Sequence, residues 1–340
     1  MTGGSGPPTL EQVAALAGVS RATVSRVVNG SPKVSPAVRA QVERAVAKLG
    51  YVPNRAARSL VTRRADSVAL VVSEPHARFF SEPFFAGMVR GVSAALAETG
   101  VQLLLLIAQD LPDRGWLGRY VVGGHVDGVL LASLHADDPL PGTLERAGVP
   151  AVLIGRPVDQ TVPGSYVDAD NRGGAGKAVG HLAARGRRRI ATITGSLDMG
   201  VGQDRLQGYR DGLATAGLAG AGDLVETGDF TEEGGAVAMD RLLERPGDPV
   251  DAVFAASDLM AAGALRALRV AGRRVPEDVA VVGFEDSAVA RYAQPPLTTV
   301  RQPIEEMGRQ ATRLLLAQVA GEAGGMHLVL DTELVVRASA

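Results

Sequence analysis

Apolar residues follow two different patterns along the chain. Over residues 10–49 they recur every three or four positions, which is the spacing of short amphipathic helices. From residue 66 onward, short continuous apolar runs alternate with helical patterns. Strands buried on both faces have continuous apolar sequences, so this alternation predicts parallel sheets covered by helices. We therefore expect an all-α head followed by an α/β body.

The head carries the capping signals of three helices. Thr9 and Gln12 form a capping box, and Gly18 permits the positive φ of a tight turn after the first helix. Ser20 can cap a second helix, and Ser35 followed by proline is a typical helix start. The predicted helices begin at Leu10, span 21–28 and run from Pro36 to Leu49. A helix, a glycine-containing turn and a second helix are the arrangement of a DNA-binding helix-turn-helix.

The second of these helices has a polar face suited to DNA. Val24, Val27 and Val28 should turn toward the core of the head, which leaves hydroxyl and amide side chains and two arginines on the other face. Arginine can bond guanine in the major groove, and hydroxyl groups reach phosphates. The DNA-binding residues predicted here are Ser20, Arg21, Ala22, Thr23, Ser25, Arg26 and Asn29.

A short arginine-rich segment follows the head. Asn54 can cap a helix over 54–60 that is too short to be stable alone in water, which predicts a hinge that folds on DNA. An apolar side chain among arginines suits a wedge in the minor groove, and an ordinary linker is the alternative. The predicted DNA-binding residues of the hinge are Asn54, Arg55, Ala57, Arg58 and Leu60.

Charge divides the chain at the same place. Residues 1–64 contain ten Lys and Arg and two Glu, a balance of +8, whereas the remaining residues carry −10. A basic module fused to an acidic body indicates a polyanion-binding head, with a solvated basic face as the plainer interpretation.

The body is long enough for two lobes. Apolar runs predict strands at 67–72, 101–107, 126–131, 151–154, 189–194, 251–255 and 279–284, with strand-like runs at 328–330 and 333–336. The predicted division is a helix-turn-helix domain over 1–50, a hinge over 51–65 and an effector-binding and dimerisation domain over 66–340. Its N-lobe is expected at 66–167 and 298–326, and its C-lobe at 168–297 and 327–340. In such open sheets, ligands bind at the carboxyl ends of the strands.

Composition excludes several classes of protein. The chain has no cysteine, which rules out a disulfide scaffold and a cysteine-ligated metal. The longest apolar stretch, 103–108, has the length of a buried strand and is too short for a membrane span. Residues 1–8 lack the features of a secretory signal, so we expect a cytoplasmic protein without a membrane partner.

The sequence contains no catalytic constellation. Residues 173–177 resemble a phosphate-binding loop, but Asn171 and Ala178 stand where that motif needs Gly and Ser or Thr. We interpret Asp170 and Asn171 as a helix start instead. The five histidines lack the spacing of metal ligands. The sequence therefore predicts no enzyme, cofactor or metal site.

Residues 9–29 and 50–60 resemble, without a gap, the head and hinge of the LacI/GalR family of repressors. The resemblance continues through 251–258, 281–286 and 296–303, and so covers almost the whole chain. It implies a periplasmic-binding-protein-like body of two doubly wound parallel-sheet lobes with an effector between them. It also implies a homodimer on a pseudo-palindromic DNA operator.

The same resemblance implies an effector site. Arg205 matches the arginine with which family members grip the effector, while Ser257 and Glu285 stand where Asn and Asp are commoner. Phe85 and Phe230 match the positions of stacking rings, and a core position is the alternative for either. The predicted effector-binding residues are Phe84, Phe85, Arg156, Asp198, Arg205, Phe230, Ser257, Asp258 and Glu285.

Three segments, 79–85, 122–129 and 209–213, look most like the cellobiose-responsive members of this family from actinobacteria. Acids, an arginine and aromatic rings suit a neutral polyol. The resemblance thus implies repression of sugar-utilisation genes that cellobiose or a related oligosaccharide releases. Maltose, another glycoside, a xylo-oligosaccharide or a nucleobase is the alternative effector, and co-repression is the alternative to induction.

Overall fold

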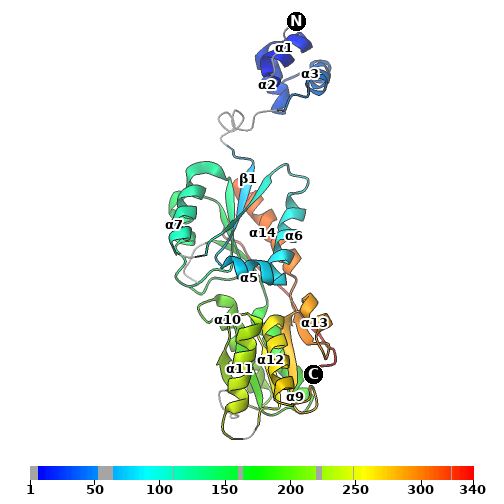
Figure 1. The fold of residues 1–340 in the computed structure, drawn as a ribbon. Helices are drawn as coiled ribbons and strands as arrows, with labels where there is room; N and C mark the ends of the chain where they lie inside the picture. The colour runs from blue at the N-terminus through cyan, green and yellow to red at the C-terminus, as the bar shows by residue number, and fades with distance from the viewer. Residues whose placement is uncertain are drawn as a thin grey trace. The chain divides into compact units, whose positions relative to one another are not determined.

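A computed structural model of the protein describes residues 7–52, 64–109, 111–159, 164–219, 224–247, 249–322 and 324–340. The chain forms two compact units, residues 1–65 and residues 66–340 (Figure 1). The first unit is helical and the second combines helices with two sheets, which confirms the predicted fold class.

Capping interactions set the helices of the head. The N–H of Gln12 donates to Thr9 Oγ1 at 3.3 Å and the N–H of Thr9 donates to Gln12 Oε1 at 2.9 Å, so the capping box is complete. Gly18 then adopts a φ of 60°. The helices are α1 (Leu10–Ala17), α2 (Arg21–Val28) and α3 (Pro36–Leu49). Their common core contains Val13, Ala14, Ala17, Val24, Val27, Val42, Ala45 and Tyr51.

The first lobe of the body is a six-stranded parallel sheet with helices on both faces. Its strands are β1 (Ser67–Val72), β2 (Gln102–Ile107), β3 (Gly128–Ala132), β4 (Ala151–Ile154), β5 (Ser165–Ala169) and β11 (His327–Leu330), in the order β11-β5-β4-β3-β1-β2. Its helices are α5 (His76–Ser81), α6 (Pro83–Leu96), α7 (Leu111–Tyr120), η1 (Val121–His125), α8 (Leu140–Ala147) and α14 (Ile304–Val319). Apolar side chains of α6 and α14 pack on one face of the sheet and those of α7 and α8 on the other. Figure 1 shows α7 on the opposite side of the sheet from α6 and α14.

The second lobe repeats this architecture. Its strands are β6 (Ile190–Thr194), β7 (Val225–Thr227), β8 (Ala252–Ala255), β9 (Ala280–Glu285), β10 (Thr298–Arg301) and β12 (Glu333–Val335), in the order β12-β10-β9-β8-β6-β7. Its helices are α9 (Asn171–Ala184), α10 (Gly200–Thr215), α11 (Glu232–Glu244), α12 (Asp258–Val270) and α13 (Ala288–Tyr292). Strand β12 runs antiparallel to β10, and the other neighbours are parallel.

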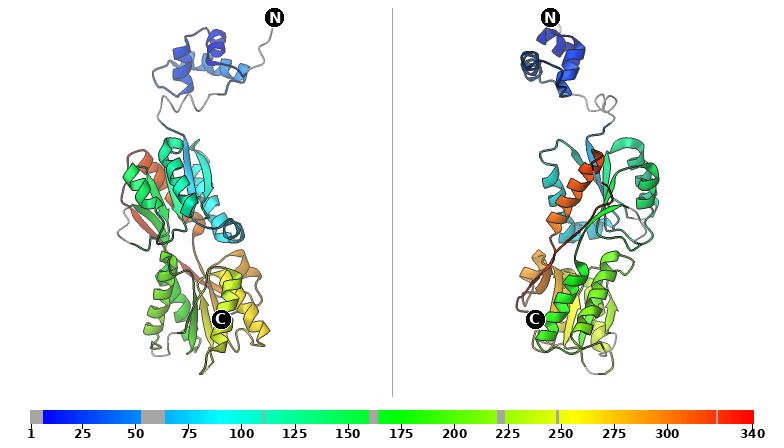
Figure 2. Two further views of the ribbon diagram at one scale, coloured as in Figure 1. Left: turned by 60° about the vertical axis from the view of Figure 1, so that its left-hand side comes forward. Right: turned by 180° about the vertical axis from the view of Figure 1, so that it is seen from behind.

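The chain crosses between the lobes three times, after β5, after β10 and after β11 (Figure 2). The predicted lobe boundaries are wrong at two of these crossings. Residues 298–301 pair with β9 in the second sheet, and residues 327–330 pair with β5 in the first. Hydrogen-bonding partners decide which lobe a strand joins, and a single sequence does not show those partners. Three of the strands, β5, β7 and β10, were not predicted, because polar residues interrupt their apolar pattern.

Glycines allow α6 and α14 to approach each other closely. A Cβ atom at Gly91 would lie 2.0 Å from the carbonyl oxygen of Glu305, and one at Gly308 would lie 2.6 Å from that of Met88. Backbone atoms have little freedom to withdraw, so a side chain at either position must separate the two helices.

Gly91→Ala should therefore lower the free energy of unfolding of the body by about 2 kcal/mol, as overpacking of a tight interface does. Gly180→Ala is the matched control, because a Cβ atom there meets nothing within 4 Å and alanine favours the helix. Urea denaturation followed by circular dichroism compares the two variants. Equal stabilities would contradict this description of the α6–α14 contact.

Candidate functional site

The predicted recognition face of α2 is open to solvent. Arg21, Ala22 and Arg26 are exposed, whereas Val24 and Val27 are buried in the core of the head. The helix therefore presents two cations beside a small residue, which permits close approach to a groove of DNA.

Other predicted residues of this helix hold its ends. Ser20 Oγ accepts the N–H of Thr23 at 3.1 Å and caps α2. Asn29 Nδ2 donates to Ser25 Oγ at 3.3 Å. The predicted hinge residues lie outside the described residues: Asn54, Arg55, Ala57, Arg58 and Leu60.

The body contains a cavity that both lobes line. The first lobe contributes side chains from α5, from the start of α6 and from the segments that follow β3 and β4. The second lobe contributes the starts of α9 and α10 and the end of β9. The cavity lies at the strand ends, where open α/β sheets bind ligands.

Arg205 is the most constrained side chain of the cavity. Its Nε donates to Asn171 Oδ1 at 2.9 Å and one terminal nitrogen donates to Gln302 Oε1 at 3.1 Å. The other terminal nitrogen donates to the carbonyl oxygen of Ala256 at 2.5 Å, and the guanidinium lies 3.7 Å from the centre of the Phe284 ring. Burial lowers the pKa of Arg205 to about 10, so it remains charged at neutral pH.

Three carboxylates line the cavity with Arg205. Burial raises the pKa of Asp168 to about 6 and that of Glu82 to about 7, and it raises the pKa of Glu285 well above its ordinary value. Asp168 Oδ1 accepts from Asn171 Nδ2 at 3.0 Å. Among the described residues, none donates a hydrogen bond to the carboxylate of Glu285. Glu285 is therefore the acid of the cavity whose side chain keeps its hydrogen-bonding capacity for a ligand.

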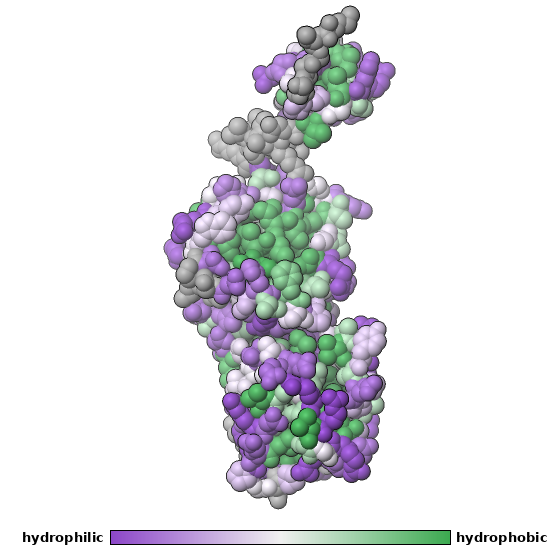
Figure 3. Space-filling view, viewed as in Figure 1, coloured by the Kyte–Doolittle hydropathy of each residue, from purple (hydrophilic) through white to green (hydrophobic). Residues whose placement is uncertain are grey.

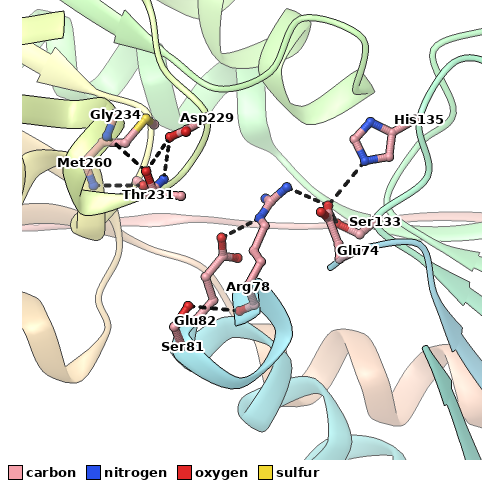
Figure 4. Close-up of polar contacts among 11 residues, drawn as sticks. Glu74, Arg78, Ser81, Glu82, Ser133, His135, Asp229, Thr231, Gly234 and Met260 are labelled. Atoms are coloured by element: carbon pink, nitrogen blue, oxygen red, sulfur yellow. Dashed lines mark hydrogen bonds and ion pairs between the residues drawn. The ribbon is translucent and has the colours of Figure 1, made fainter. Parts of the chain in front are cut away.

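The other two arginines of the cavity are paired with acids. Arg78 donates to Glu74 and to Glu82, each at 2.6 Å (Figure 4). Arg156 of the first lobe bonds Asp204 of the second. Because both guanidinium groups have acidic partners, the cavity does not offer them as free counter-ions for an anionic ligand.

Two aromatic rings face the cavity. Phe84 lines it from the first lobe and Phe230 from the second. Phe230 has a positive φ of 67°, and its ring occupies the space beside Gly195, where a Cβ atom would lie 1.9 Å from the ring. Rings of this kind can stack against the apolar face of a sugar.

The chain matches two known families. Residues 9–54 match the bacterial regulatory proteins of the lacI family, and residues 179–340 match a periplasmic binding protein-like domain. The HTH-type transcriptional regulator CelR from Thermobifida fusca is 58% identical over 98% of each chain. The HTH-type transcriptional repressor CytR from Escherichia coli strain K12 is 33% identical over 97% of this chain and 96% of its own.

The chain belongs to the LacI family of bacterial regulatory proteins.

Solved structures agree with this assignment. A structure described as the transcriptional regulator CelR-cellobiose complex is 55% identical, with a TM-score of 0.79 over 98% of this chain and 100% of its own. The lac repressor dimer bound to operator and the anti-inducer ONPF is 28% identical, with a TM-score of 0.84 over 98% and 99%. Membership in this LacI family of regulators confirms the prediction that the chain is not an enzyme.

Five of the nine residues predicted for the effector site line the cavity: Phe84, Arg156, Arg205, Phe230 and Glu285. Phe85 lies one position along α6 from Phe84, and its side chain is buried in the core of the first lobe instead. Asp198 bonds His135 of the first lobe and is not among the lining residues.

Ser257 and Asp258 do not line the cavity either. Ser257 Oγ caps α12 by accepting the N–H of Met260 at 3.2 Å. Asp258 is fully buried and accepts from Thr299 Oγ1 at 2.6 Å and from the N–H of Ser287 at 2.7 Å. Both side chains therefore hold the second lobe together.

Sequence reasoning missed several lining residues of this LacI-family cavity. Asp168 and Asn171 flank the first crossing, and a polar cluster directly after a strand was a signal that could have found them. Arg78 and Glu82 belong to α5 and its end, a helix that was not predicted. Gln302 lies on the second crossing, which was assigned to the wrong lobe.

The phosphate-loop interpretation of residues 173–177 does not apply, because these residues form part of α9. Asp170 caps this helix by accepting the N–H of Gly173 at 2.8 Å.

In the described part of the chain, no group of three acidic or histidine side chains could hold a metal ion. None of the described helices has the length and apolarity that crossing a bilayer requires.

Asp258→Ala should lower the free energy of unfolding by about 3 kcal/mol, because it leaves the buried hydroxyl of Thr299 and the partly buried N–H of Ser287 without their acceptor. Asp278→Ala is the control: Asp278 also accepts from a backbone N–H, that of Arg274 at 2.8 Å, but it is partly exposed, so its loss should lower the free energy of unfolding much less. Urea unfolding measures both variants. If Asp258→Ala were as stable as the unaltered protein but no longer bound the ligand, Asp258 would belong to the effector site after all.

Proposed function

We propose that this LacI-family chain is a transcriptional repressor that binds operator DNA as a homodimer and is released by cellobiose or a related cello-oligosaccharide. The observation that carries the proposal is the likeness to CelR, which is 58% identical over 98% of the chain and therefore spans both the head and the body. A repressor of this kind acts in the cytoplasm, where the chromosome lies.

The chemistry of the cavity supports a neutral sugar. Arg78 and Arg156 are paired with acids, while Glu285 remains an acceptor for hydroxyl groups. Phe84 and Phe230 offer apolar faces from opposite lobes. A phosphorylated sugar would bring two negative charges beside the acids of this cavity, where Arg78 and Arg156 already have acidic partners.

The head supports DNA binding. Its exposed Arg21 and Arg26 lie on a helix that is capped and buttressed by a small apolar core. With a balance of +8 over residues 1–64, the head is attracted to the phosphate backbone at long range. A two-fold dimer places one such helix on each half of a pseudo-palindromic site.

An apolar face on the first lobe supports the dimer. Strand β2 is an edge of its sheet, Phe80 of α5 is 76% exposed and Leu105 of β2 is 40% exposed. Apolar side chains gather on the face of this lobe beside α5 and α6 (Figure 3). Exposed apolar edges invite pairing, and a second copy of the chain would cover this one.

Release follows if the sugar prefers a body conformation that the operator-bound dimer cannot adopt. The ligand then weakens operator binding by the difference between its affinities for the two conformations, about 1–3 kcal/mol in typical allosteric proteins.

Cellobiose should raise the Kd for a labelled pseudo-palindromic operator by about ten-fold or more. Fluorescence anisotropy at fixed salt measures it, since affinity for DNA falls steeply with ionic strength. Glu285→Gln should keep operator affinity and lose most of the response to the sugar. Cellobiose 6-phosphate should have no effect.

Three results would contradict this proposal in different ways. Tighter operator binding with cellobiose would make the sugar a co-repressor. Release by maltose or a nucleoside and not by cellobiose would replace the effector. Failure to prefer operator over random DNA would refute the repressor itself.

Arg26→Ala should weaken operator binding by about 1–3 kcal/mol, the contribution of one good arginine contact to a base. Arg44→Ala removes the same charge from the exposed surface of α3 and serves as the control, with a smaller loss expected. Anisotropy titrations with operator and random DNA compare the two variants. Equal losses for both would show that Arg26 contributes charge alone.

A further inference from the structure

One segment of the second lobe docks against the first lobe beside the effector cavity. The N–H of Ala136 in the first lobe donates to the carbonyl oxygen of Asp198 at 2.9 Å. A Cβ atom at Gly200 would lie 2.3 Å from the carbonyl oxygen of Arg156, so the backbones of the two lobes are in direct contact there. Residues 198–200 therefore mark the place where the lobes meet.

His135 lies at this contact between two acids. Its Nδ1 is 2.6 Å from Oδ2 of Asp198, and its Nε2 is 3.5 Å from Oε1 of Glu74. Asp198 belongs to the second lobe and Glu74 to the first. A doubly protonated imidazole can donate to both carboxylates, while a neutral one can donate to only one.

Glu74 connects this contact to the wall of the cavity (Figure 4). It accepts from Ser133 Oγ at 2.6 Å and from Arg78 at 2.6 Å. The guanidinium of Arg78 lies 5.0 Å from the centre of the Phe230 ring of the second lobe. Ser133, Arg78 and Phe230 all line the cavity.

The docked segment also leads directly into the helix that carries Arg205. Helix α10 begins at Gly200, and Arg205 is in its second turn. Asp204, one residue earlier, bonds Arg156 of the first lobe. Helix α10 therefore carries both a contact between the lobes and Arg205, the residue expected to bind the effector.

We propose that His135 is a positioning residue: in its protonated form it bridges Asp198 and Glu74, holds the two lobes together around the sugar, and so makes sugar affinity depend on pH. The proposal rests on the proposed function, because it requires that the sugar bind in this cavity.

The surroundings of His135 give the sign of the effect. The side chain of Glu74, opposed by burial and helped by Asp198, raises the pKa of His135 from its ordinary 6.5 to about 8. Separated lobes remove Asp198 and keep Glu74, so only the part of the raised pKa that is due to Asp198 stabilises the docked lobes, and this stabilisation is lost as pH rises through about 8. Sugar affinity should therefore fall as the pH rises.

Other groups near His135 are also charged. Asp137 and Asp138 are on its own segment, and Arg78 lies on the far side of Glu74. Burial raises the pKa of Glu82, which lines the cavity, to about 7, so it titrates in the same range. A pH profile of the unaltered protein therefore contains several groups, and only its difference from a variant without His135 isolates the bridge.

The test is calorimetric titration of the full chain with cellobiose at pH 6.5, 7.5, 8.5 and 9.5, for the unaltered protein and for His135→Gln. Because the pKa of His135 rises from 6.5 to about 8, its protonation can change the affinity for cellobiose by at most about thirty-fold. We expect the change in affinity that depends on His135 to be about five-fold, since the site is partly open to solvent. The affinity of the unaltered protein should fall by that factor more than the affinity of His135→Gln. His76→Gln replaces an exposed histidine of α5 and should follow the unaltered profile.

The proposal is overturned if the cellobiose affinities of the unaltered protein and of His135→Gln change in parallel with pH. This holds even if His135→Gln binds more weakly at every pH, because His135 would then have only a structural role. If His135→Gln does not fold, Asp198→Asn provides the same comparison, because its side chain is 55% exposed and loses only its charge. Absence of cellobiose binding at every pH would instead refute the proposed function, and the bridge would fall with it.

Discussion

The buried guanidinium of Arg205 is the interaction on which the arrangement of the body depends. It bonds Asn171 on the first crossing between the lobes and Gln302 on the second. The third crossing is tied to the first, since the N–H of Asp170 donates to the carbonyl oxygen of Leu330 at 2.8 Å. Hydrogen bonds therefore link all three connections between the lobes. A ligand that competes for the donors of Arg205 acts on this whole network at once.

The sequence predicted the head more accurately than the body. Caps are local signals, so Thr9, Gly18 and Ser20 determine where α1 and α2 begin and end. Most strands of the body were also predicted, because apolar runs buried on both faces are unmistakable. Membership of a lobe depends on distant pairing partners, as at residues 298–301 and 327–330, and no local pattern shows such pairing.

The effector site was predicted only in part, and the reasons are geometric. Phe84 and Phe85 are adjacent in sequence, yet the turn of α6 sends one ring to the cavity and the other to the core. Asp258 follows a strand end as a ligand-binding acid would, but the hydroxyl of Thr299 and the N–H of Ser287 already occupy its carboxylate. Arg78 and Glu82 were missed because α5 is a single short helix between two stronger signals.

The glycine-mediated approach of α6 to α14 has a consequence for how the body responds to its ligand. Helix α14 begins two residues after Gln302, which bonds Arg205, and its backbone touches that of α6 through Gly91 and Gly308. Helices in such contact cannot slide past each other without a clash. A displacement of the second crossing should therefore move α14 and α6 together. The first lobe transmits force because its interior is too close-packed to absorb it.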